Sequence, residues 1–324
     1  MRARDPGGRI DVVKVHFERF CVVGIGGHAR TKLIPALQAN GQRVAAVVTS
    51  RPSNDLPGVQ SFRRLEEAVD GLPPDVAFLV ATPPALHFPQ ARLILGRGFD
   101  LFLEKPAFVV RREAEEAASL CEAKSAVLVE GLMHRYTELY SKLREFWSKS
   151  RASMRRIEIR FLIDEMPAGT FRSERQLASS ALFDFGCYPL SLLQDIGLGE
   201  AALRIEEAAF ADDPDRTRLH IVGAAGDIAI DIHIGVGDSY VNSVCCATMD
   251  GETMCFAPFF YGRPAERTIS VHANGTVQTK KFHDGNAFEA MLSRPRDDWR
   301  ADQARRNRDM VEVTGRLEAL ARSL

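Results

Sequence analysis

The sequence has no surplus of charge of either sign and no long hydrophobic run. Its 42 Lys and Arg residues balance 43 Asp and Glu residues, which leaves a formal net charge of -1. Nucleic-acid-binding proteins usually carry a basic patch, but the short basic run at 151–160 is interleaved with apolar residues. No stretch reaches the roughly 20 apolar residues of a membrane span. We therefore expect neither a nucleic acid nor a membrane as a partner.

Cysteine motifs and a targeting signal are also missing. The six cysteines form no CxxC pair and lie mostly in apolar segments, so we interpret them as buried thiols in a reducing compartment. His220 and His233, in strand-like runs, are interpreted as core or sheet-face residues, and no metal site is expected. Residues 1–16 are charged throughout and lack the apolar core of a signal peptide, which predicts a loose leader and a cytoplasmic location.

The patterns that are present predict two domains. A chain of 324 residues exceeds what one hydrophobic core usually organises. Over residues 17–131, short apolar runs alternate with helical patterns, which is typical of a parallel sheet with crossover helices. The predicted strands are 19–23, 43–48, 76–81, 100–103 and 126–129. The predicted helices are 61–72, with Ser61 as its N-cap, and 111–124.

Beyond residue 150 the pattern changes to alternating polar and apolar residues. This predicts a mainly antiparallel sheet with one open face, built from 155–163, 204–210, 218–222, 227–234 and 268–271. Asp250-Gly251 and Asn274-Gly275 predict hairpin turns, and 302–323 predicts a closing helix. An apolar face on 227–234 that one helix layer would not cover predicts a homodimer or homotetramer.

The predicted fold class is therefore α/β. Residues 17–131 are expected to form a Rossmann domain with a doubly wound parallel sheet. Residues 132–324 are expected to form an α+β domain on an open, mainly antiparallel sheet, for substrate binding and oligomerisation.

A glycine-rich turn directly follows the first predicted strand. It has the GxGxxA form of a dinucleotide-binding turn, and residues 32–38 are helical in pattern after it. Gly24 would permit the tight turn, Gly26 would let the backbone approach a pyrophosphate, and Ala29 would let the helix pack closely on the strand. The helix amides would then face the anion. The predicted cofactor-binding residues of this turn are Gly24, Ile25, Gly26, Gly27, His28 and Ala29.

The end of the second predicted strand favours NADP over NAD. An NAD-selective fold usually has Asp or Glu here to bind the ribose hydroxyls, but this sequence has Ser50 and Arg51. A hydroxyl and a guanidinium suit the 2′-phosphate of NADP. The alternative is an exposed arginine in a polar loop. We therefore expect NADP as the cofactor and keep NAD as the alternative.

Three further motifs follow in order: Ala81-Thr82-Pro83-Pro84 with His87, then Glu104-Lys105-Pro106, then Asp184-Phe185-Gly186-Cys187-Tyr188. With the glycine-rich turn they resemble the Gfo/Idh/MocA family, which includes glucose-fructose oxidoreductase, inositol dehydrogenases and dihydrodiol dehydrogenase. The resemblance covers nearly the whole chain after Glu18. It implies an NAD(P)-dependent oxidoreductase that transfers a hydride between nicotinamide and a carbinol or carbonyl carbon of a sugar, cyclitol or related diol. It also implies cofactor contacts from Thr82, Pro83, His87, Glu104 and Lys105.

The resemblance further implies three catalytic residues. It places Lys105 beside the nicotinamide and the substrate hydroxyl, where it would steer the carbinol proton and stabilise alkoxide charge. Tyr188 stands where many members have histidine, and would protonate a carbonyl oxygen, or accept a proton if Lys105 lowers its pKa. Asp184, one helical turn earlier, would bind a substrate hydroxyl. The alternatives are a surface lysine paired with Glu104 and a core tyrosine with a satisfied hydroxyl.

Departures from the family leave the substrate open. Ser179-Ser180-Ala181 stands where the family often has a glycine-rich stretch. Arg135, Tyr136 and Arg172 are predicted to line a polyol pocket, and His134 is either a pocket residue or a structural one. Two further functions stay open: a non-catalytic NAD(P)-binding regulator of the same fold, and an enzyme that acts on a nucleotide-linked sugar.

Overall fold

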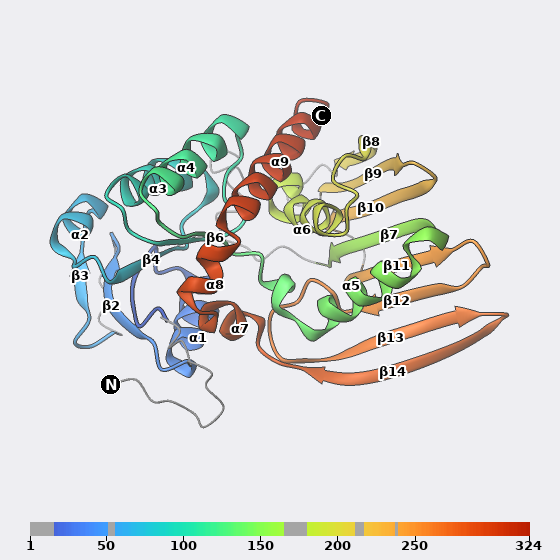
Figure 1. The fold of residues 1–324 in the computed structure, drawn as a ribbon, viewed down its shortest axis with the longest axis horizontal. Coiled ribbons are helices and arrows are strands. Elements are labelled where there is room, and N and C mark those ends of the chain that lie inside the picture. The colour runs from blue at the N-terminus through green and yellow to red at the C-terminus, as the bar shows by residue number, and fades with distance from the viewer. Residues whose placement is uncertain (1–15, 51–55, 165–179, 211–216, 237–238) are drawn as a thin grey trace, which may run out of the picture.

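Two sheets, one in each half of the chain, organise the protein (Figure 1). The structure is a computed structural model, and it describes residues 16–50, 56–164, 180–210, 217–236 and 239–324. Residues 1–15 of the predicted leader, together with Arg51 and Arg172, lie outside the described residues.

The first sheet has six parallel strands in the order β3-β2-β1-β4-β5-β6. This is the order of a Rossmann sheet, in which ligands bind where the order reverses, here between β1 and β4. All five residues of β4 are buried because helices cover both faces of the sheet. The predicted parallel sheet is therefore confirmed. Its strands are β1 (Arg19–Val23), β2 (Arg43–Val48), β3 (Gln60–Phe62), β4 (Val76–Val80), β5 (Leu101–Leu103) and β6 (Leu128–Glu130).

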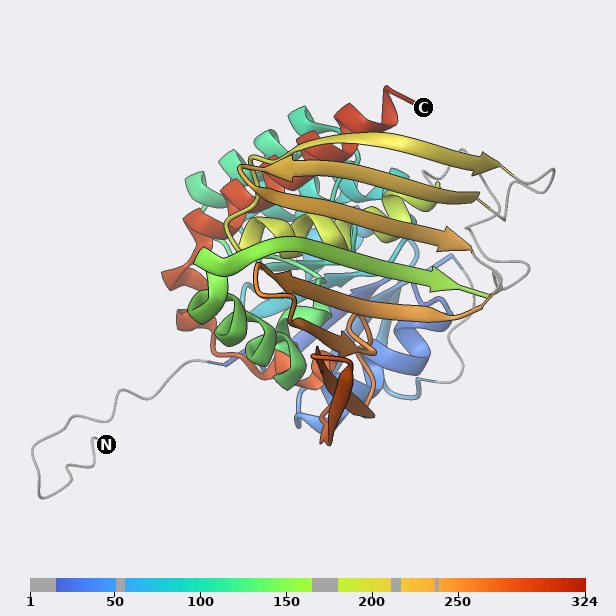
Figure 2. The ribbon, with the colours of Figure 1, turned by 90° about the vertical axis from the view of Figure 1, so that its right-hand side faces the viewer.

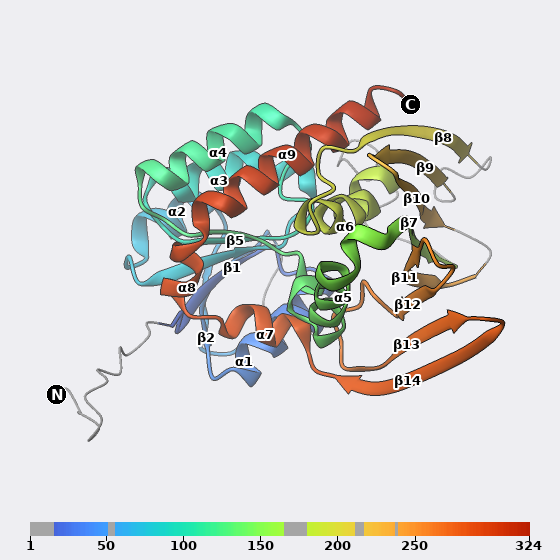
Figure 3. The same cartoon turned by 45° about the vertical axis from the view of Figure 1, so that its right-hand side comes forward.

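Two layers of helices cover this sheet (Figure 3). One core packs α2 (Leu65–Gly71), α3 (His87–Gly96) and α4 (Arg111–Ala123) on one face. On the other face lie α1 (Ile34–Ala39), which continues a π-helical turn at Ala29–Leu33, and two helices from the end of the chain. Those two are α7 (Ala287–Ser293) and α8 (Arg296–Ala301).

The predicted helix 61–72 was wrong at its start. Residues 60–62 form β3 at the edge of the sheet, and Ser61 pairs with Val47 instead of capping a helix. Helix α2 begins only at Leu65. The edge of β2 offers backbone hydrogen bonds to any short extended segment, and three residues are too few to show a strand pattern.

The second sheet has eight strands in the order β14-β13-β12-β11-β7-β10-β9-β8. Neighbours are antiparallel except β7 and β10, which are parallel. All five predicted segments lie in strands apart from Asp227, which precedes β10, whereas β11, β12 and β14 were predicted only as the runs that flank the two hairpin turns. The strands are β7 (Met154–Ile163), β8 (Ala202–Phe210), β9 (Thr217–Ala225), β10 (Ile228–Val236), β11 (Val241–Thr248), β12 (Thr253–Ala257), β13 (Ala265–Ala273) and β14 (Thr276–Asp284).

Helices cover only one face of the second sheet. Helices α5 (Glu138–Ser150) and α6 (Ala181–Asp195) pack on it, and Figure 2 shows the opposite face without a helix over it. The apolar side chains of Ile230, Ile232 and Ile234 belong to the covered face and are at most 2% exposed. The apolar face on which we based oligomerisation is thus already buried within the chain. That argument was wrong, and the open face carries the polar side chains of β10.

The last helix connects the two halves. Helix α9 (Gln303–Ala321) packs against α4 on one side and α6 on the other, and Figure 1 shows it running across both. Gly186 in α6 permits the close approach, because a Cβ there would lie 2.9 Å from Cδ2 of Leu317. No helix in the described part of the chain is long and apolar enough to span a membrane.

The cysteines divide into two groups. Cys245 and Cys255 stand opposite each other on β11 and β12 and form a disulfide, with Cα atoms 4.1 Å apart. Our interpretation of all six as thiols was wrong for this pair, because it ignored the register of the hairpin around Asp250-Gly251. The other four are buried free thiols: Cys21, Cys121, Cys187 and Cys246.

Candidate active site

The glycine-rich turn leaves β1 with a glycine that no other residue replaces easily. Gly24 has φ +83°, and its N–H donates to the carbonyl oxygen of Val48 at 3.0 Å. A Cβ at Gly24 would lie 2.7 Å from Cγ2 of Thr82. Positive φ and close packing both favour glycine at this position. Gly24 therefore joins the ends of three neighbouring strands: β1, β2 and β4.

Gly26 and Gly27 differ from Gly24 because they border open space. A Cβ at either position would meet no atom within 4 Å. Ala29 behind them is fully buried, and no side chain caps the helical turn that begins there. The first amides of a helix need outside partners and attract anions. The turn thus fits the pyrophosphate of a dinucleotide, which would lie over Gly26 and Gly27.

We expect Gly26→Val to weaken NADP(H) binding about tenfold or more, a loss of roughly 1.4 kcal/mol, while the melting temperature stays unchanged. The valine would occupy the space that a pyrophosphate needs, and it would strain nothing in the free protein. Gly24→Ala should instead lower the melting temperature, because it forces a left-handed residue against Thr82. Isothermal titration with NADPH checks the first effect and calorimetry the second. Unchanged NADPH affinity in Gly26→Val would contradict this assignment of the cradle.

Thr82, Pro83 and His87 follow β4 at the same edge of the sheet. The ring of His87 is fully buried, and its Nε2 lies 2.9 Å from the carbonyl oxygen of Thr82. Its Nδ1 lies 3.0 Å from the carbonyl oxygen of Pro106. Burial lowers the pKa of His87 in spite of these carbonyl contacts. His87 therefore links the loops after β4 and β5, and its predicted cofactor contact stays a prediction.

Glu104 and His28 connect the glycine-rich turn to the end of β5. Nε2 of His28 lies 3.3 Å from Oε1 of Glu104. Burial alone would raise the pKa of Glu104, but His28 and Lys105 hold it below its usual value. An ionised carboxylate thus lies behind the lysine. We had not predicted this contact, because the two residues are far apart in the sequence.

Lys105 meets Asp184 and Tyr188 between the two sheets. Its Nζ donates to Oδ1 of Asp184 at 2.7 Å and to the Asp184 carbonyl oxygen at 2.8 Å. The same Nζ lies 4.9 Å from the centre of the Tyr188 ring. The Lys105 side chain is only 12% exposed, so the alternative of a surface lysine paired with Glu104 is wrong. The structure brings the three predicted catalytic residues into one cluster.

Helix α6 presents Asp184 and Tyr188 on the same side. The Ser180 hydroxyl accepts a hydrogen bond from the Phe183 amide and caps the helix. Residues four apart in a helix lie one above the other, so Asp184 and Tyr188 both face Lys105. We predicted that Asp184 binds a substrate hydroxyl. In the structure its carboxylate instead accepts a hydrogen bond from Lys105, and this contact positions the lysine.

The Tyr188 ring is buried, and its hydroxyl has no hydrogen bond to any residue that the structure describes. Burial raises the pKa of Tyr188 well above its usual value, and the opposing effect of Lys105 is smaller. The phenol is therefore protonated at neutral pH. The structure disfavours the possibility that Lys105 lowers the pKa enough to make Tyr188 a base. It also leaves the core-tyrosine alternative without the expected partner for the hydroxyl.

Glu130 is a site residue that the sequence analysis missed. It ends β6 beside Leu103 of β5, and its Oε1 accepts a hydrogen bond from the Ala107 amide at 3.0 Å. Burial raises the pKa of Glu130. The sequence pattern that could have identified it is an acidic residue directly after two apolar strand residues. Such a residue lies near the site because the carboxyl ends of parallel strands meet at one edge of the sheet.

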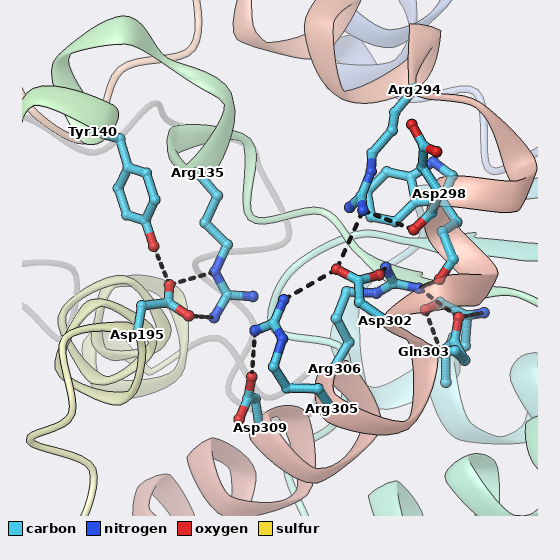
Figure 4. Close-up of polar contacts among 12 residues, drawn as sticks. Arg135, Tyr140, Asp195, Arg294, Asp298, Asp302, Gln303, Arg305, Arg306 and Asp309 are labelled. Carbon is cyan, nitrogen blue, oxygen red and sulfur yellow. Dashed lines mark hydrogen bonds and ion pairs between the residues drawn. The ribbon is translucent and has the colours of Figure 1, made fainter. Parts of the chain in front are cut away.

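Arg135 and Tyr136, which we predicted in a polyol pocket, make intramolecular contacts instead. Arg135 forms two hydrogen bonds with Asp195, at 2.8 and 3.1 Å, and Tyr140 donates to the same carboxylate (Figure 4). The Tyr136 ring packs on Trp299, with centroids 5.7 Å apart. These contacts give both residues a packing role, and substrate binding by them stays a prediction.

Further interactions surround that packing. Trp299 is fully buried, and the guanidinium groups of Arg294 and Arg306 each lie 4.4 Å from its ring centre. Both arginines also reach Asp302, at the start of α9 (Figure 4). This network fixes α8 and α9 against the first sheet, so the arginines shown there serve the fold.

His134 is a buried neutral residue. Both ring nitrogens lack a hydrogen-bond partner among the described residues, and aromatic rings surround it, including Tyr188 with centroids 5.4 Å apart. Burial lowers the pKa of His134 well below its usual value, and Arg135 adds to this. Of the two alternatives, the structure supports a structural histidine.

We expect the free energy of unfolding to decrease as the pH is lowered below 6.5, partly because of His134. There the unfolded chain binds a proton that buried His134 does not, so stability decreases by up to about 1.4 kcal/mol per pH unit for this residue. His134→Leu should remove that share, whereas His272→Leu, at an exposed position, should not. Urea unfolding at pH 7.5 and 5.5 measures both. Equal pH dependence in His134→Leu and the unchanged protein would mean that His134 is charged in the fold.

Comparison with known proteins finds a family model that matches the part of the chain that forms the first sheet. Residues 18–132 match the Gfo/Idh/MocA model, described as an oxidoreductase family with an NAD-binding Rossmann fold. The predicted resemblance to this family is thus confirmed over the residues that the match covers.

Relatives and solved structures extend the likeness. A dTDP-3,4-didehydro-2,6-dideoxy-alpha-D-glucose 3-reductase from Streptomyces antibioticus is 25% identical over 185 residues, which are 53% of this chain and 54% of that one. Galactose 1-dehydrogenase from Pseudomonas fluorescens is 29% identical, over 32% of this chain and 37% of its own. The matches thus span about half or less of these relatives.

A 3-ketoreductase from Actinomadura kijaniata, solved with NADP and TDP-benzene, shares the fold over 94% of this chain and 97% of its own. The TM-score is 0.81 at 16% identity. Both halves of the predicted fold class are therefore confirmed, including the mainly antiparallel second sheet.

Proposed function

We propose that this chain is an NADP-dependent oxidoreductase that interconverts a carbonyl and a carbinol on a sugar-like substrate. The observation that carries the proposal is the cluster of Lys105, Asp184 and Tyr188. It lies at the carboxyl edge of a nicotinamide-binding sheet, next to the cradle around Gly26. Open α/β sheets place their ligands at this edge.

The chemistry of the cluster suits carbonyl reduction. When bound, the nicotinamide supplies or accepts the hydride. The protonated Tyr188 hydroxyl donates its proton to the carbonyl oxygen as negative charge develops there. Lys105 brings positive charge to the same oxygen and stabilises it. Oδ1 of Asp184 holds Nζ of Lys105 at 2.7 Å. Any contact of Asp184 with the substrate must be compatible with this ion pair. The reverse reaction uses the same groups in the opposite order.

Two observations support NADP rather than NAD. Ser50 follows β2 and is exposed, at the position where the ribose of the adenosine would lie, and no acidic residue stands there. The following Arg51 would neutralise a 2′-phosphate. We expect NADPH to bind more tightly than NADH, and titration of the purified protein with each cofactor measures the difference.

Among sugar-like substrates, we favour a nucleotide-linked ketosugar over a free sugar. Several relatives favour it, because they are reductases of a dTDP-linked sugar. Free sugars and cyclitols stay open through galactose 1-dehydrogenase and a scyllo-inositol 2-dehydrogenase. The experiment that tests the function follows nicotinamide absorbance with a panel of dTDP-linked ketosugars, aldoses and inositols. Turnover of any of them supports the oxidoreductase, and the preferred one identifies the class.

The non-catalytic regulator remains the rival function. It would bind NADPH tightly and convert no compound of the panel. The protonated Tyr188, whose ring centre lies 4.9 Å from Nζ of Lys105, argues against it, because a regulator needs no proton donor there. The domain boundary at residue 131, the cytoplasmic location and a homodimer or homotetramer also remain proposals. Light scattering of the purified protein measures the oligomeric state.

A further inference from the structure

The open face of the second sheet carries a compact group of two histidines and one carboxylate. His233 and Asp231 are two residues apart on β10, so both side chains point to the same face. His220 on β9 is the direct cross-strand partner of His233. Their side chains are 20–27% exposed. This group lies on the face opposite to α6 and takes no part in the site described above.

The two imidazoles converge on a single oxygen atom. Nε2 of His220 lies 3.1 Å and Nε2 of His233 lies 2.8 Å from Oδ1 of Asp231. The two rings stack with centroids 4.2 Å apart and an angle of 8° between their planes. The three donor atoms lie within 4.8 Å of one another. Two stacked imidazoles that share one acceptor oxygen gain little stability over a single hydrogen bond. Hydrogen bonding to Asp231 therefore does not explain why both histidines are placed there.

The separations match those of ligands around zinc. Zn²⁺ binds histidine nitrogen and carboxylate oxygen at about 2.0–2.2 Å in a tetrahedron, which puts neighbouring ligand atoms about 3.3 Å apart. The two N···O distances of 2.8 and 3.1 Å need to open by only a few tenths of an ångström, and the stacked rings must turn so that both Nε2 atoms point at the ion. Three protein ligands also leave a fourth position for water, as in many zinc sites.

The surroundings admit an ion. A hollow of about 600 Å³ borders His220 and Asp231 on this face. Arg156 contacts the other carboxylate oxygen of Asp231 at 2.8 Å, which leaves Oδ1 to the histidines. The positive charges of Arg156 and Arg160 oppose a cation, and Glu158, which contacts both guanidiniums, offsets part of that charge.

We propose that His220, Asp231 and His233 bind one divalent transition-metal ion of the zinc type on the open face of the second sheet. From the sequence we expected no metal site. The ligands come from two strands, and their spacing resembles no zinc motif. The sheet register creates the site. It is independent of the proposed oxidoreductase function, since Tyr188 packs on Phe161 and Phe260 at the covered face of the sheet, opposite to this group.

The test is a Zn²⁺ titration of the untagged protein by calorimetry. We expect one ion per chain. His220→Gln, His233→Gln and Asp231→Asn should each weaken binding by more than about tenfold, since even loss of an outer-shell partner costs about 10–100-fold. His272→Gln, which changes an exposed histidine on β13, is the matched control and should bind as the unchanged protein does.

Cobalt provides a second measurement that does not depend on variants. Co²⁺ in a tetrahedral site with nitrogen and oxygen ligands gives intense visible absorption bands, and addition of Zn²⁺ should abolish them. Absence of stoichiometric Zn²⁺ binding, equal Zn²⁺ affinity in the three ligand variants, or absence of the Co²⁺ bands would each overturn the proposal. Far-UV circular dichroism confirms that the variants are folded.

Discussion

Tyr188→Phe is expected to lower kcat for carbonyl reduction by about 10²–10⁴-fold, while NADPH affinity stays within about twofold. The substitution removes one oxygen and almost no packing volume, so the aromatic contacts with Phe161 and Phe260 remain. What is lost is the proton donor. Because burial raises the pKa of Tyr188, the group is protonated throughout the neutral range and its loss should be felt at every pH there.

Steady-state kinetics and NADPH titration measure the two effects of Tyr188→Phe. Tyr240→Phe is the matched control, because that tyrosine is 47% exposed just before β11 and plays no part in the proposed site. We expect the control to keep kcat within a fewfold of the unchanged protein. If Tyr188→Phe has near-normal kcat while a deuterium isotope effect shows that hydride transfer limits the rate, Tyr188 is a core aromatic residue.

Lys105→Met is expected to lower kcat by a similar factor, about 10²–10⁴-fold. Methionine keeps the length of the side chain and removes the charge that would stabilise the alkoxide. Asp184→Asn should have a smaller effect, because asparagine still offers an oxygen to Nζ, and it should change KM as well as kcat. Single-turnover kinetics at saturating NADPH measure these rates.

The double variant of Lys105 and Asp184 tests whether the two act as one unit. If Asp184 works by holding Lys105, the combined loss should be close to that of Lys105→Met alone. Lys149→Met changes an exposed lysine of α5 and serves as the control. Additive losses would mean that Asp184 acts on the substrate directly, as we first predicted from its motif.

Strands buried on both faces were predictable from the sequence. β1 and β2 have the bounds that we predicted, because the last four residues of β1 and the last three of β2 are apolar and buried between the helix layers. β14 itself shows no strand pattern, since seven of its nine residues are exposed and no alternation of apolar residues marks it; only the predicted hairpin turn before it pointed to a strand. The short edge strand β3 depends on the neighbouring β2 for its hydrogen bonds, and local propensity carries no sign of it.

The candidate site was predictable where motifs carry it and not where distant residues meet. Lys105 and Tyr188 were found through their motifs, and the fold brings them together. The contact of His28 with Glu104 depends on the relation of two strand ends, which single-sequence patterns do not report. The contact of Arg135 with Asp195 was missed for the same reason, because the two residues lie 60 positions apart in the sequence.

The central claim is that Lys105 and Tyr188 form a hydride-transfer site. The measurement that tests it most directly is single-turnover transfer of deuterium from 4-deuterated NADPH to a carbonyl substrate from the panel, followed by mass spectrometry of the product. We predict deuterium at the new carbinol carbon, with transfer slowed at least about a hundredfold in Tyr188→Phe and Lys105→Met. Transfer at the unchanged rate in both variants, or no transfer to any panel compound by protein that binds NADPH, would contradict the claim.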